Sequence, residues 1–60
     1  MNDREVLEWV KHQIEGCRLN AMHAYNRNDI HSFENINVKI RYFERIAEIL
    51  EEKAKQDEEQ

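Results

Sequence analysis

Apolar residues recur along this chain in two series, each advancing alternately by three and four positions. This spacing is the heptad rhythm of helices that pack side by side. We call the two series the first seam and the second seam. The first seam is Leu7, Val10, Ile14, Cys17, Ala21 and Ala24, and the second is Phe33, Ile36, Ile40, Phe43, Ala47, Leu50 and Ala54.

The two seams match when the chain is folded back on itself around Asn28. Ala24 then faces Phe33 near the fold, and Leu7 faces Leu50 at the other end. Small residues on one seam meet large ones on the other, which keeps the volume of a helix pair constant. We therefore predict an all-α fold, an antiparallel two-helix hairpin that dimerises into a four-helix bundle.

The chain is predicted to form a single helical-hairpin domain over residues 1–60. Asn2 or Asp3 is a suitable N-cap for a first helix over about 3–26. A turn at 27–29 follows, because asparagine tolerates the left-handed conformation that ends a helix and Asp29 can cap the next. The second helix is predicted over about 30–55. Residues 56–60 form an acidic tail that we expect to fray, since acids are unfavourable at a helix C-terminus.

Five residues are left over once the seams are paired, and they carry the interaction hypothesis. Trp9, Tyr42, Ile46 and Ile49 form a second apolar face beside the seams, and Gly16 removes a side chain on the same flank. Three interpretations remain open. The face widens the core of the hairpin, joins two hairpins into a homodimer, or receives a different protein.

Composition limits the class of protein. The chain has 37% charged residues, no proline and one glycine, which suits helix throughout. Its only cysteine, Cys17, excludes an internal disulfide and suits a small core residue in a reducing compartment. No apolar run is long enough for a membrane span and no signal peptide is evident, so a cytoplasmic protein without membrane contact is expected.

Candidate chemistry is sparse. His12 shares a face with Glu8 and Glu15, but His23 lies about 16 Å further along the helix axis, too far for one metal ion. No histidine stands on the seam beside Cys17, and phosphate-binding or zinc-protease motifs are missing. We therefore expect no enzymatic activity, no cofactor, no metal and no small-molecule substrate.

The charge distribution also disfavours nucleic acid. The net charge is −4, and residues 1–47 carry seven acids and seven bases, so the excess of acid lies in the C-terminal segment. Lys39, Arg41 and Arg45 form a small basic patch, but acidic residues are interleaved with it. A neutral body with an acidic end attracts a phosphate backbone weakly.

The expected function is therefore a small non-enzymatic regulator or adaptor that binds protein through a helical face. Its partner is a second copy of itself, another protein, or both. By analogy with other short acidic helical proteins, an inhibitor or modulator of a host protein from a bacterium or phage is one expected form. A structural or assembly subunit of a larger complex is the alternative, and a nucleic-acid-associated protein is a weaker third.

Overall fold

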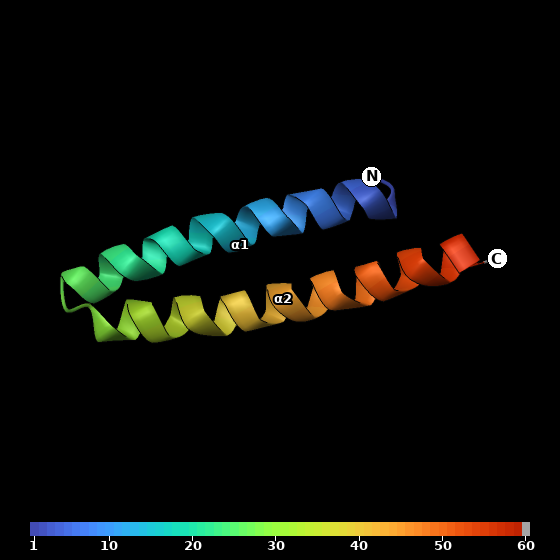
Figure 1. Ribbon diagram of the computed structural model, residues 1–60. Helices are drawn as coiled ribbons and strands as arrows, with labels where there is room; N and C mark the ends of the chain where they lie inside the picture. The colour runs from blue at the N-terminus through green and yellow to red at the C-terminus, as the bar shows by residue number, and fades with distance from the viewer. Residues whose placement is uncertain (60) are drawn as a thin grey trace.

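The protein is a two-helix hairpin in which the helices run in opposite directions and both ends of the chain lie opposite the turn (Figure 1). The computed structural model describes residues 1–59, with side chains through Asp57. Helix α1 spans Asp3–Asn26 and helix α2 spans Ile30–Glu59. The described chain measures 49 × 15 × 14 Å along its principal axes. The predicted all-α antiparallel hairpin is confirmed, whereas its dimerisation stays a prediction.

Capping side chains and a left-handed residue define where the helices begin and end. The Asn2 side chain accepts a hydrogen bond of 2.9 Å from the Glu5 backbone N–H at the start of α1. Asn28 adopts a positive φ of 61° after α1, a conformation that asparagine tolerates better than most residues. The Asp29 carboxylate then accepts a hydrogen bond of 3.2 Å from the Ser32 N–H and caps α2. The turn is thus built from the residue types that the sequence offers for it.

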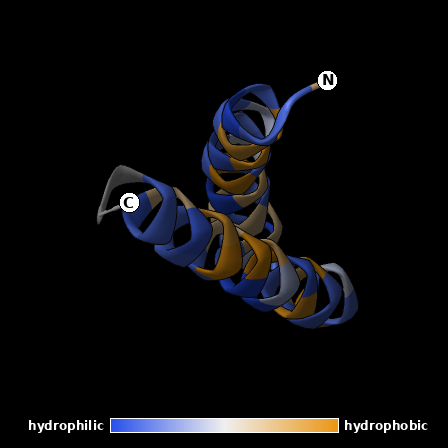
Figure 2. Cartoon of the chain, turned by 90° about the vertical axis from the view of Figure 1, so that its right-hand side faces the viewer, coloured by the Kyte–Doolittle hydropathy of each residue, from blue (hydrophilic) through white to orange (hydrophobic). Residues whose placement is uncertain are grey.

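The core is a thin layer between the two helices. Its buried cluster draws on both predicted seams, and Figure 2 shows hydrophobic bands interleaved with hydrophilic ones along each helix. Ala21 and Ala24 are also buried, and they let the helices approach closely near the turn. The cluster consists of Val10, Ile14, Ile40 and Ala47, packed against the partly buried Val6, Leu7, Cys17, Ile36 and Phe43.

Ion pairs between the helices accompany this packing. Lys53 and Asp3 lie 2.6 Å apart at the open end, and Arg18 and Glu44 lie 3.3 Å apart in the middle. All four side chains are exposed to solvent, so each pair contributes little to stability. The pairs join residues that face each other when the chain folds back at 27–29, as the paired seams require.

The open end of the hairpin differs from the sequence expectation in two ways. Helix α2 continues through Glu59, beyond the predicted end near residue 55, because residues 51–59 contain good helix formers and neither proline nor glycine. Ala54, the last residue of the second seam, is exposed because α1 begins at Asp3 and offers it no apolar partner. Gln60, the end of the predicted tail, lies outside the described residues.

Neither α1 nor α2, as far as the structure describes them, has the length and apolar character that crossing a membrane requires.

Candidate interaction face

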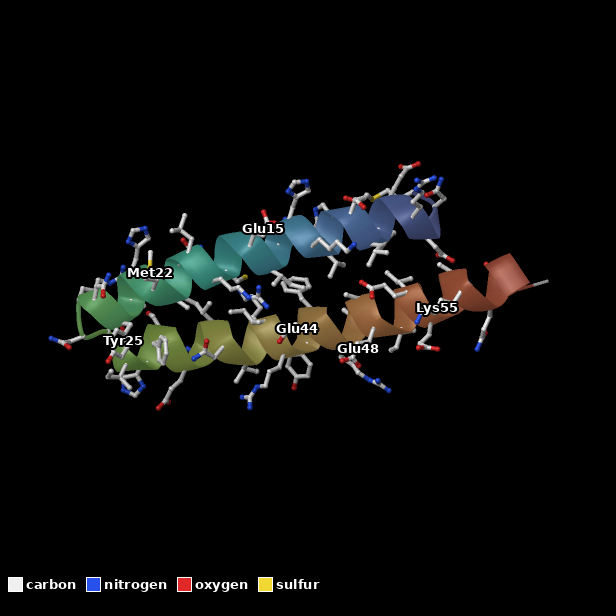
Figure 3. The ribbon with its side chains drawn as sticks, viewed as in Figure 1. Glu15, Met22, Tyr25, Glu44, Glu48 and Lys55 are labelled. Atoms are coloured by element: carbon white, nitrogen blue, oxygen red, sulfur yellow. The ribbon has the colours of Figure 1, made fainter. Side chains whose placement is uncertain are left out.

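The two long sides of the hairpin differ in charge. On one side, an open groove runs above Ile14 and Ala47, and charged residues of both helices line it. We call this side the charged face, and Figure 3 labels three of its acids, Glu15 on α1 and Glu44 and Glu48 on α2. The charged residues that line the groove are Lys11, Glu15, Arg18, Glu44, Glu48 and Glu51.

The opposite side holds all five residues that the sequence singled out. Near the turn its lining includes His23 and Arg27 at the end of α1 and Asn35 at the start of α2, together with Asn20 and Ser32. Residues seven apart lie on the same side of a helix in such a pair. Trp9 and Gly16 precede His23 by two heptads and one, and Tyr42 and Ile49 follow Asn35 by one and two, while Ile46 follows Ser32 by two. We call this side the Trp9 face.

The Trp9 face is almost free of charge. Its heptad positions within the two helices include two lysines and no acid, and Arg27 lines it just after α1, whereas the corresponding positions of the charged face carry eleven charged residues. Interface cores are typically depleted of charge and enriched in aromatic residues. The positions of the Trp9 face are Asn2, Val6, Trp9, Gln13, Gly16, Asn20 and His23 on α1, and Ser32, Asn35, Lys39, Tyr42, Ile46, Ile49, Lys53 and Gln56 on α2. The charged residues of the other side are Arg4, Glu8, Lys11, Glu15, Arg18, Glu34, Arg41, Glu44, Glu48, Glu51 and Lys55.

Large side chains of the Trp9 face remain in contact with solvent. Trp9 is 48% exposed, Tyr42 69%, Ile46 41% and Ile49 52%. The Trp9 ring also touches the core, since its centroid lies 5.9 Å from that of Phe43 in an edge-to-face contact. The hairpin therefore uses one side of this ring and leaves nearly half of the residue unburied.

Gly16 forms an unfilled notch in the same face. A Cβ atom built at this position would meet no other atom within 4 Å. The backbone of α1 is helical at Gly16, and its φ is not positive. Neither crowding nor backbone conformation within the hairpin thus requires glycine here.

No protein-family model, no curated protein and no solved structure matches this chain.

A second exposed apolar group escaped the sequence interpretation. Met22, Tyr25 and Ile30 lie close to the turn, and each is at least half exposed. They occupy the turn end of the charged face, between Arg18 on α1 and Glu34 on α2, and they lie off the seams, so the apolar rhythm of the seams does not reveal them. Tyr25 packs against Phe33 with ring centroids 5.5 Å apart, which gives this group a role in closing the turn end.

Among the described residues, the acidic, basic and histidine side chains are exposed or paired. Hydrogen bonds from the side chain and backbone of Ser32 hold the pKa of the Asp29 carboxyl below its usual value. The hydrogen bond to Asp3 raises the pKa of Lys53. Within the described residues, no three His, Cys, Asp or Glu side chains are grouped so that they could hold a metal ion. Cys17 is a free, half-buried cysteine in the first seam.

Proposed function

We propose that this protein is a non-enzymatic protein-binding module, a regulator or adaptor whose working surface is the Trp9 face. The observation that carries the proposal is the contrast between the two sides. One side is covered with charges, several of them in ion pairs between the helices. The other exposes aromatic and aliphatic side chains with hardly any charge. Exposed aromatic and aliphatic side chains on a surface depleted of charge are typical of an interface.

The size of the hairpin core supports the same proposal. Among the described residues, six apolar ones are buried, three of them alanines. A core this small supplies little net stability, and small domains usually gain the rest from staples or association. Burying Trp9, Ile46 and Ile49 in an interface adds large side chains to the apolar area removed from water.

The proposal is tested by comparing two variants that introduce the same charge on different sides. Ile46→Glu places a carboxylate on the Trp9 face, where the side chain is 41% exposed. Val38→Glu is the matched control, because Val38 is 39% exposed and lines a separate groove with Glu34 and Glu44. The tagged proteins are cross-linked in cells that produce them, and the attached proteins, including further copies of the chain, are identified by mass.

We expect wild type and Val38→Glu to retain the same cross-linked proteins and Ile46→Glu to lose them. A carboxylate buried in an apolar contact without a partner costs several kcal/mol, enough to abolish most interfaces. Equal retention by all three proteins contradicts the proposal. So does a loss that is the same for both variants, because it would show that the Trp9 face has no special role.

A further inference from the structure

We infer that the occupant of the Trp9 face is a second copy of this chain, held by a twofold axis that runs parallel to the hairpin. The two turns then lie at the same end of the dimer. In this arrangement α1 of each copy lies on α2 of the other, and Tyr42 of each copy covers the notch at Gly16 of the other. The inference rests on the proposed function, since it names the partner of the same face.

Residues of the face lie in matched pairs along the hairpin axis. Folding back around the turn places Trp9 at the height of Ile49, Gly16 at the height of Tyr42, and His23 at the height of Asn35. A twofold axis along the hairpin preserves these heights and exchanges the helices. Each residue of α1 therefore contacts the α2 residue of the other copy that lies at the same position along the hairpin axis.

The side chains that contact each other across this dimer are complementary in size and polarity. Trp9 meets Ile46 and Ile49, an aromatic ring on aliphatic side chains. Tyr42, exposed by 69%, meets Gly16, where nothing lies within 4 Å of a Cβ position. The polar residues near the turn meet one another. The single hairpin does not require glycine at position 16, but this dimer does. A ring can pack directly on the backbone only where no side chain intervenes.

Charge selects this arrangement over the other twofold. The alternative twofold axis runs across the hairpin. If the apolar residues still overlapped, α2 of one copy would lie on α2 of the other. Lys39 of each copy would then face Lys53 of the other copy. Like charges in a desolvated contact are costly. With the axis along the hairpin, Lys39 lies near Asn20 of the other copy and Lys53 keeps Asp3, 2.6 Å away, as its own partner. The Trp9 face carries no acid, so the contact buries none of its carboxylates.

The surface is also large enough for a stable dimer. Interfaces of standard size bury about 800 Å² on each partner. A face 49 Å long and 15 Å wide is comparable with that area when it is covered along its whole length. Turns at the same end bring the full lengths of the two hairpins into register.

The first experiment measures the distance between the two turns. Cys17→Ala removes the native thiol, and His31→Cys places one spin label on an exposed residue next to the turn. We expect an intermolecular distance much shorter than the 49 Å length of the hairpin. A distance that approaches this length places the turns at opposite ends and overturns the arrangement. The doubly substituted protein is checked against wild type for helix content and dimer affinity.

The second experiment tests the notch. Gly16→Leu introduces a better helix former at a position where a Cβ atom has open space, so we expect unchanged or higher helix content and a dimer dissociation constant raised more than about tenfold. Adding Tyr42→Ala to Gly16→Leu removes the ring that Leu displaces and should recover much of the loss. If Gly16→Leu dimerises as tightly as wild type, or if Tyr42→Ala does not rescue it, the contact between Tyr42 and Gly16 is refuted.

The failures of the two proposals differ. A wild-type chain that stays monomeric at millimolar concentration, while cross-linking to another protein through Ile46, overturns this inference and leaves the proposed function standing. If Ile46→Glu changes neither self-association nor the cross-linking of other proteins, the proposed function and this inference are both wrong.

Discussion

Individual residues divide into those that hold the hairpin together and those that it leaves exposed. Ile40 is 9% exposed and belongs to the buried cluster, whereas Ile46, less than two turns further on, is 41% exposed. The two isoleucines have the same chemistry and differ in the side of α2 that they occupy. Their substitutions therefore separate folding from interaction.

We predict that Ile40→Glu unfolds the chain and that Ile46→Glu leaves the hairpin partly helical. A carboxylate placed in the buried cluster without a partner costs several kcal/mol, comparable with the whole stability of so small a domain. At position 46 the carboxylate stays in water in a single hairpin. Far-ultraviolet circular dichroism at low concentration measures both effects. Equal loss of helix in the two variants would contradict the separation of core and Trp9 face.

The ends of the helices are where local sequence and structure agree most closely. Asn28 and Asp29 have the residue types that a left-handed turn and an N-cap call for, and they adopt these roles. Such features depend on a few neighbouring residues and can be predicted from them. The continuation of α2 to Glu59 could not, because a helix end without a glycine or proline is set by weak terms of similar size.

The cap of α2 makes the stability of the protein depend on pH in acid. Because Ser32 lowers the pKa of Asp29 in the folded state, the ionised cap stabilises the fold above the usual aspartate pKa of 3.8. This contribution is lost as the pH falls through the lowered folded pKa. Asp29→Asn keeps an oxygen acceptor for the Ser32 N–H without the titration.

We therefore predict that wild type melts at a higher temperature than Asp29→Asn above the usual aspartate pKa, and that the difference shrinks as the pH drops below it. Thermal melts of the two proteins across the acid range measure this difference. A difference that is independent of pH would show that ionisation of Asp29 contributes nothing to the cap.

The periodicity of the sequence determined the pairing of α1 with α2 but not everything that the pair leaves exposed. Seam residues such as Val10 and Ala47 could be paired in advance because each heptad position has one matching position in an antiparallel neighbour. The edge-to-face contact of Trp9 with Phe43 depends on side-chain conformation, which a periodic pattern does not contain. Met22, Tyr25 and Ile30 were missed because their spacing follows no seam.

At the scale of the whole molecule, the hairpin is a rod in which one side carries most of the charges. The other side carries Trp9, Tyr42, Ile46 and Ile49 among mainly uncharged polar residues. The charged face keeps its lysines, arginines and acids hydrated and is not expected to associate with itself. The Trp9 face exposes Trp9, Tyr42, Ile46 and Ile49 and belongs to a molecule with a thin core. Association of two copies through this face would explain both features at once, and this self-association is the central claim.

Sedimentation equilibrium at micromolar concentration tests that claim most directly, with wild type, Ile46→Glu and Val38→Glu measured side by side. We predict twice the chain mass of 7.3 kDa for wild type and Val38→Glu, and the mass of one chain for Ile46→Glu. A wild-type protein that sediments as a single chain of 7.3 kDa and still melts cooperatively would contradict it.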